Sequence, residues 1–181
     1  DLHSILDAFA DYFHNGQITY EAFVDGVAYG GREYVEHPEA FGVPERNVAY
    51  VQSTRKPLDD IIAFLSEHEE ELDSLDIVAA DTALYRKIEE QIPRVTKSVY
   101  TTSAVSYRLE ISHKNSGKAT GLAYVLKLLD ITPEETVAFG DGDNDAEMLE
   151  FAGLGVAMEN ATENCKAAAD IVCDCCKNDG V

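Results

Sequence analysis

Apolar positions in the first part of the chain follow two different periods. Residues 2–13 place apolar side chains three and four positions apart, which is the spacing of one helix face. Residues 17–31 instead contain two short runs rich in β-branched and aromatic side chains, separated by Asp25 and Gly26. Because an Asp-Gly pair suits the tight turn of a hairpin, this stretch predicts two antiparallel strands after the first helix.

The middle of the chain continues this mixture of helix and strand. The helical spacing returns over residues 57–72, and Pro57 favours a helix that begins at that residue. A strand is predicted over residues 75–80, followed by a helix over 81–92 with an aspartate as its N-cap. Residues 94–112 then supply two β-rich stretches. These elements together predict an α/β domain.

From residue 116 onward, helices and short apolar strands alternate strictly. The short links between them favour right-handed crossovers and a parallel sheet. The strands lack a two-residue alternation, so we expect both of their faces to be buried. The predicted elements are a helix over 116–130, a strand over 136–140, a helix over 144–152, a strand over 153–158, a helix over 161–169 and a strand over 170–173.

Composition narrows the classes of partner. The chain has 181 residues, of which 45% are apolar, and a formal net charge of −20. So much negative charge disfavours binding to nucleic acid or to an anionic membrane. No apolar run is long enough for a membrane span, and the N-terminus does not resemble a signal peptide. The cysteines, three of them clustered near residue 175, do not form a disulfide framework, which favours a reducing, cytoplasmic location.

The most unusual stretch is "AFGDGDND", residues 138–145. It follows an apolar strand and begins a helix, so it lies at the carboxyl edge of the predicted sheet, where open α/β sheets bind ligands. Its like charges need compensation, and oxygen-only ligands favour Mg²⁺ for that purpose. The side chains concerned are Asp141, Asp143, Asn144 and Asp145.

Three other interpretations of this stretch are possible. A calcium-binding EF-hand loop needs glycine where Ala146 stands, glutamate where Ala152 stands and a preceding helix, so it is rejected. A dinucleotide-binding fingerprint lacks its third glycine, and three carboxylates would repel a pyrophosphate. A capped helix whose acids are simply solvated stays open on the residues alone.

Lys118 is a second candidate, because it lies in the first turn of a predicted helix that Ser116 could cap. A cation in that place is disfavoured by the helix dipole unless it pairs with an anion. The phrase "SGKAT" does not meet the requirements of a nucleotide-binding P-loop. From the residues alone, a solvated surface lysine is the alternative.

Taken together, these motifs resemble the haloacid dehalogenase-like (HAD) hydrolases of the Cof-type branch. The likeness runs from about residue 109 to the end and includes the lysine helix, "GDGDND", "EMLEFAGLGVAMENA" and the final "NDGV". The resemblance implies a Rossmann-like core over residues 113–181 and an α/β cap domain over 1–112. It also implies a Mg²⁺-dependent phosphatase that acts on a small phosphorylated metabolite through an aspartyl-phosphate; it does not indicate an oligomeric state.

The resemblance assigns a role to each candidate residue. Lys118 would hold the nucleophile and the phosphate, and Asn144 would contact the phosphate or orient Asp145. Asp141 would be a Mg²⁺ ligand, and Asp145 would support the metal shell. Asp143 falls at a variable position of the motif, and we expect it to be exposed to solvent.

One part of the family pattern is missing. The family's nucleophile lies in an Asp-x-Asp-Gly-Thr motif, and the nearest string here, "FVDGVAY", has Phe23 in the place of the nucleophile. We therefore expect a fragment of the enzyme that is inactive alone. The alternative is a non-catalytic module, a pseudo-enzyme that binds a metal or a partner.

Overall fold

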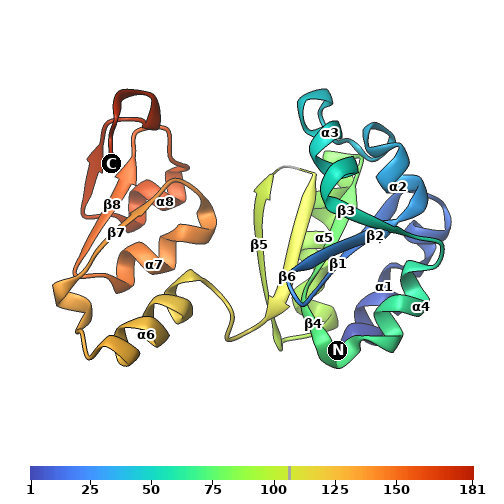
Figure 1. The fold of residues 1–181 in the computed structure, drawn as a ribbon, viewed down its shortest axis with the longest axis horizontal. Coiled ribbons are helices and arrows are strands. Elements are labelled where there is room, and N and C mark those ends of the chain that lie inside the picture. Colours follow the sequence, from blue (N-terminus) through green and yellow to red (C-terminus); the bar gives the residue numbers. More distant parts are fainter. Residues whose placement is uncertain (106) are drawn as a thin grey trace. The chain divides into compact units, whose positions relative to one another are not determined.

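The computed structural model describes residues 1–105 and 107–181, and it divides into two compact units. They span Asp1–Lys114 and Asn115–Val181 (Figure 1). The division falls two residues after the one expected from the sequence. The α/β class predicted for the chain is confirmed, because each unit combines helices with a sheet. No helix in the described part of the chain is long and apolar enough to cross a membrane.

The first unit contains a six-stranded mixed sheet in the order β3-β2-β1-β4-β6-β5. Within it, β2 and β3 are parallel and the other neighbours are antiparallel. Its strands are β1 Ile18–Val24, β2 Val27–Gly31, β3 Arg55–Leu58, β4 Leu72–Ala79, β5 Val99–Val105 and β6 Arg108–His113. Its helices are α1 Leu2–His14, α2 Arg32–Glu36, α3 Glu45–Thr54, α4 Ile61–Glu67 and α5 Thr82–Val95, with 3-10 helices η1 Pro38–Phe41 and η2 Glu69–Glu71.

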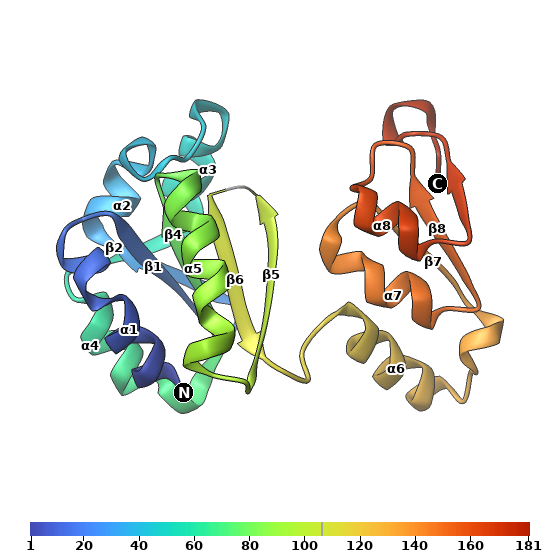
Figure 2. The same cartoon turned by 180° about the vertical axis from the view of Figure 1, so that it is seen from behind.

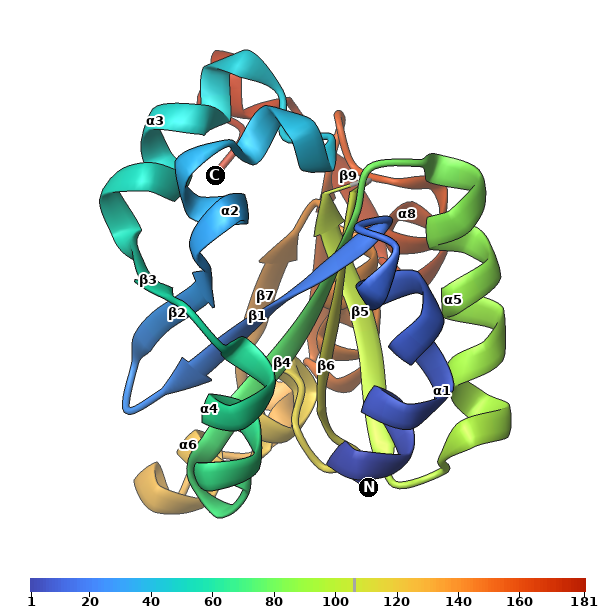
Figure 3. The ribbon, with the colours of Figure 1, turned by 90° about the vertical axis from the view of Figure 1, so that its right-hand side faces the viewer.

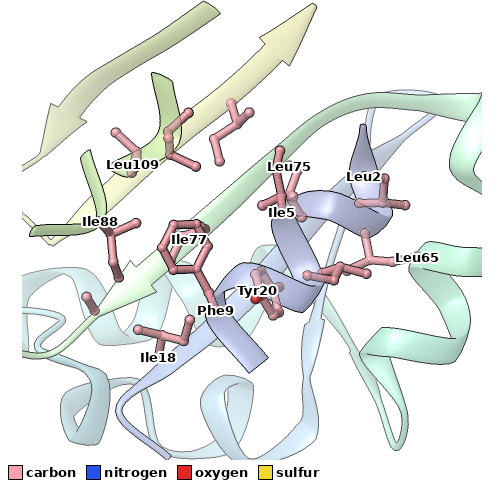
Figure 4. Packing of buried hydrophobic residues seen from close by; sticks show 14 of the residues in the cluster. Leu2, Ile5, Phe9, Ile18, Tyr20, Leu65, Leu75, Ile77, Ile88 and Leu109 are labelled. Carbon is pink, nitrogen blue, oxygen red and sulfur yellow. The ribbon is translucent and has the colours of Figure 1, made fainter. Parts of the chain in front are cut away.

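One face of this sheet carries the main hydrophobic core. Alternate residues of β1 and β4, such as Tyr20 and Ile77, pack against α1, α4 and α5 (Figure 4). From α1, Phe9 is fully buried in this cluster, and Ile88 of α5 joins it. Figure 3 shows α1 and α5 on one side of the sheet and α2 and α3 on the other.

The opposite face of the sheet buries charged side chains under α2 and α3. Glu21 of β1 is wholly buried and accepts hydrogen bonds from the Tyr34 hydroxyl at 2.6 Å and from Nε and Nη2 of Arg55 at 2.9 and 3.1 Å. This bidentate pairing compensates a carboxylate that burial would otherwise destabilise strongly. The pair also ties β1 to β3 and α2.

Asp76, next to Glu21 on β4, is compensated far less well. Its Oδ2 lies 3.3 Å from Nε of Arg108, but its Oδ1 has no hydrogen-bond partner in the described part of the chain. Arg108 is shared with Glu21 and Glu110. Burial therefore raises the pKa of Asp76 well above its ordinary value, and the attraction of Arg108 offsets only part of that rise.

Two local predictions for this unit have opposite outcomes. The hairpin is confirmed, with Asp25 and Gly26 both at positive φ between β1 and β2. The helix start at Pro57 is wrong: Pro57 lies in edge strand β3, and α4 begins at Ile61. Asp60 is the N-cap of α4, because its carboxylate accepts the Ala63 N–H at 2.9 Å.

The second unit contains a three-stranded sheet that is parallel, as predicted, and its strands lie in the order β7-β8-β9. Figure 2 shows α7 between α6 and α8. The elements are α6 Lys118–Leu129, β7 Val137–Gly140, α7 Ala146–Phe151, β8 Leu154–Met158, α8 Glu163–Ala168 and β9 Ile171–Cys173, with 3-10 helices η3 Pro133–Glu135, η4 Asp143–Asp145 and η5 Cys176–Asn178.

Burial on both faces, expected for these strands, is wrong for β7. Ala138 and Gly140 are buried, whereas Val137 and Phe139 are 55% and 40% exposed. The helices of the unit cover only the side on which Ala138 packs with Leu149 of α7. The apolar run therefore predicts the strand correctly, but it does not predict that one face of the strand is exposed.

Candidate functional site

The acidic loop begins where β7 ends, at the carboxyl edge of the parallel sheet. Gly140 closes the strand, Asp141 and Gly142 form the turn, and η4 leads directly into α7. The loop therefore lies at the sheet edge predicted from the sequence. Strand pairing of Gly140 with Ala157 fixes the start of the loop against β8.

Asp145 organises this loop. It is buried, and its Oδ2 accepts the backbone N–H groups of Asp141 at 2.9 Å and Gly142 at 3.0 Å. Its Oδ1 accepts a hydrogen bond from the ammonium of Lys118. Burial alone would raise the pKa of Asp145, but the Lys118 ammonium and the two amides outweigh it and lower that pKa below its ordinary value.

The close packing of Asp145 explains the glycine before the loop. A Cβ placed on Gly140 would lie 2.4 Å from Cβ of Asp145, closer than two non-bonded carbon atoms can approach. A Cβ on Gly142 would lie 2.7 Å only from Oδ1 of Asn144, the end of a side chain that can rotate away. Gly140 is thus needed for space rather than for a left-handed backbone conformation.

Lys118 and Asp145 are the two predicted residues that the structure joins directly. Lys118 is the first residue of α6, with Gly117 rather than Ser116 at the N-cap position. Its side chain is about half exposed, so one end of the ion pair remains open to a ligand. The unfavourable place of the lysine on the helix is offset by the buried carboxylate that it contacts.

Asp141 offers the least committed carboxylate of the loop. Its side chain is exposed, and its Oδ2 accepts one long hydrogen bond from Nδ2 of Asn160, at 3.5 Å. Its backbone carbonyl accepts the Thr162 N–H at 3.0 Å, which holds the residue in place. Asn144 lies beside it in the loop, and its side chain makes no hydrogen bond within the described residues.

Asp143 is exposed, as expected, but it also accepts a hydrogen bond from a residue that sequence reasoning missed. The Thr162 hydroxyl donates to Oδ1 of Asp143 at 2.6 Å and accepts the Cys165 N–H at 3.3 Å as the N-cap of α8. Thr162 therefore holds the loop through both its backbone and its side chain. The signal was available, because a threonine directly before a helical stretch is a favoured cap.

The loop fits a hard divalent cation only in part. Carboxylate oxygen is the donor that Mg²⁺ prefers, and Asp141 presents one with little competition. Both oxygens of Asp145 already accept hydrogen bonds from the protein. No group of three or more His, Cys, Asp or Glu side chains suited to a metal occurs in the portion of the chain that the structure describes.

Comparison with known proteins identifies the family. The sequence profile of the haloacid dehalogenase-like hydrolases matches residues 3–181. The chain belongs to this family. The resemblance inferred from the acidic loop and the lysine helix is thereby confirmed across both units.

Individual relatives of this HAD family chain are phosphatases by name. A phosphoglycolate phosphatase of Methanopyrus kandleri is 32% identical over 158 residues, which cover 84% of this chain and 66% of the relative. The phosphatase YwpJ of Bacillus subtilis is 32% identical over 169 residues, covering 84% and 59%. The chain thus spans less than two thirds of the length of these curated relatives.

The fold agrees with solved structures of the family. A haloacid dehalogenase-like hydrolase from B. subtilis superposes with a TM-score of 0.74 at 24% identity. The match covers 99% of this chain and 68% of that one. At this identity the likeness supports the HAD fold alone.

Proposed function

We propose that this chain supplies the cap and part of the catalytic core of a Mg²⁺-dependent phosphatase for small phosphate monoesters, acting through an aspartyl-phosphate. The observation that carries the proposal is the contact between Lys118 and Asp145 at the acidic loop. The half-exposed ammonium of Lys118, the exposed carboxylate of Asp141 and the amide of Asn144, which occur at the same sheet edge, support the proposal. The names of the relatives support the same reaction class.

Each residue has a separate task in this proposal. The Lys118 ammonium attracts the phosphate and balances negative charge on the transferring phosphoryl group. Asn144 donates a hydrogen bond to a phosphate oxygen, and Asp141 is the metal ligand that this loop contributes. Asp145 supports the metal shell indirectly, because it fixes the amides of Asp141 and Gly142. When bound, Mg²⁺ would polarise the phosphoryl oxygens.

The proposal includes inactivity of these 181 residues alone, because they contain no Asp-x-Asp-Gly-Thr sequence. Hydrolysis of p-nitrophenyl phosphate with Mg²⁺ measures this directly. We expect no turnover above the uncatalysed rate. Turnover that Asp141→Asn abolishes would show that the chain has a nucleophile of its own and contradict this part of the proposal.

A chimera tests the reaction itself. An N-terminal segment that carries the family's Asp-x-Asp-Gly-Thr motif, placed before residue 1, would supply the nucleophile. We expect Mg²⁺-dependent hydrolysis of phosphoglycolate or of a sugar phosphate, falling by at least about 100-fold in Lys118→Ala and Asp141→Asn. Asp130→Asn, at the exposed C-terminus of α6, is the matched control and should leave the rate unchanged.

The absent nucleophile motif also favours a second candidate, a binding module without catalysis. In that case the folded chimera would bind Mg²⁺ at Asp141 but show no turnover. Magnetic resonance of the Asp141 and Gly142 amides during a Mg²⁺ titration reports the binding independently of activity. Binding with no turnover would therefore replace the phosphatase by the binding module.

A further inference from the structure

The first unit contains a cavity of about 530 Å³, large enough for a small molecule. It lies where β1 begins and β2 ends, between the end of α1 and the start of α2. Every residue that lines it comes from the first 61 residues of the chain. Apolar side chains supply part of the wall: Phe13, Ile18, Tyr34, Phe41 and Ile61.

The polar part of the wall carries an excess of negative charge. Four carboxylates line the cavity with one guanidinium, that of Arg32. The guanidinium is already paired, because its Nε lies 2.6 Å from Asp59 and its Nη1 lies 3.4 Å from Glu36. Glu33 has no charged partner within the described residues. This surplus of negative charge would repel an anionic ligand.

The hydroxyl of a largely buried residue, open to the cavity, provides a second and independent indication of a ligand. Thr19 of β1 lines the cavity and is only 4% exposed, yet its hydroxyl makes no hydrogen bond within the part of the chain described. Its oxygen is not one of the buried side-chain atoms without a partner, which in the described part of the chain are Tyr20 Oη, Asp76 Oδ1 and Arg108 Nε, so it is open to the cavity rather than sealed in the core. Thr19 therefore presents an unused acceptor inside a cavity whose charged wall is acidic.

We propose that this cavity binds a small organic cation: an ammonium group carried on an apolar body. The ammonium would donate a hydrogen bond to the Thr19 hydroxyl and be attracted by Glu33. The apolar body would pack against Ile18 and Ile61, and the rings of Tyr34 and Phe41 favour a nearby cation. A bare metal ion suits the site poorly, because apolar side chains form so much of the wall.

Titration of the intact chain with cyclohexylammonium, followed by amide magnetic resonance, tests the proposal. Saturable shifts are expected at Thr19 and at neighbouring Gly31. Cyclohexanol, which has the same body without the charge, should bind at least about 10-fold more weakly, and cyclohexanecarboxylate should not bind. Equal binding of cyclohexanol would overturn the proposal, because the cavity would then recognise only the apolar body.

Variants locate the contact. Thr19→Val keeps the shape of the side chain, and we expect it to weaken cyclohexylammonium binding about 5- to 10-fold. Glu33→Gln should weaken binding about 3- to 10-fold at low ionic strength. Glu70 is exposed and lies outside the cavity, so Glu70→Gln, which removes the same charge, should leave the affinity unchanged. An equal loss with Glu70→Gln, or shifts that do not saturate, would mean nonspecific attraction to an acidic surface and contradict the site.

Discussion

The sheets of the two units differ in how they are covered. The six-stranded sheet has helices against both faces and buries large residues such as Phe9 and Tyr34 almost completely. The three-stranded sheet is covered on one side, and most of the large exposed apolar residues lie in its unit: Tyr124, Val125, Leu128, Leu129, Ile131, Val137, Phe139, Ile171, Val172 and Val181. Within the described residues, Tyr50 is the corresponding exposure in the first unit. An apolar strand is therefore buried only where another element packs over it.

The two units also differ in how they hold a buried aspartate. Asp76 in the first unit has an oxygen without a partner and shares its arginine, so burial raises its pKa. Asp145 in the second unit receives three donors, and they lower its pKa despite burial. Burial thus has opposite consequences for one residue type, and the number of donors that each carboxylate receives decides between them.

The largest expected effect is steric and confined to the second unit. Gly140→Ala forces the new Cβ against Asp145, so we expect it to destabilise this unit by about 1–3 kcal/mol. Gly121→Ala is the control. Gly121 lies on the exposed side of α6, away from its ends, and nothing lies within 4 Å of an added Cβ, so this change should stabilise the unit by about 0.5–1 kcal/mol. Hydrogen exchange of peptides from each unit measures both. A Gly140→Ala protein with unchanged exchange would show that the loop is not tightly packed.

The second prediction sets the pH responses of the two units against each other. The lowered pKa of Asp145 contributes stability that is present above its unfolded value of 3.8 and lost as the pH falls through its folded value. The raised pKa of Asp76 acts in reverse, because its folded form holds the proton more tightly: the first unit loses stability as the pH rises above 3.8 through the folded pKa.

Single variants isolate these contributions from those of the other acids. Asp76→Asn should abolish the loss of stability that the first unit shows as the pH rises above 3.8. Asp145→Asn should reduce the loss of stability that the second unit shows as the pH falls. Hydrogen exchange over a pH series, read separately for each unit, is the measurement. If Asp76→Asn left the slope of the first unit unchanged, the carboxyl would have to be ionised throughout that range.

How far the sequence predicts the molecule can be judged from particular residues. The hairpin at Asp25, the strand before the acidic loop and the meeting of Lys118 with the loop are all encoded in local pattern or in a motif. The start of α4 was misplaced because Pro57 suits an edge strand as well as a first helical turn. The burial state of Asp76 and the Thr162 contact depend on residues distant in the chain, which periodicity does not specify.

The smallest expected effect concerns Thr162, which joins the loop to α8. Thr162→Ala removes the cap of α8 and the hydrogen bond to Asp143, and we expect a loss of about 1 kcal/mol. Thr162→Ser keeps the hydroxyl and should restore most of it. Because the backbone N–H of residue 162 still donates to the Asp141 carbonyl in both variants, the loop should loosen without detaching.

Faster exchange of the Gly142 amide in Thr162→Ala than in Thr162→Ser would show that the side chain, and not the cap alone, holds the loop. Equal exchange in the two would limit Thr162 to its backbone contact and leave Asp143 as a solvated acid, as the sequence suggested.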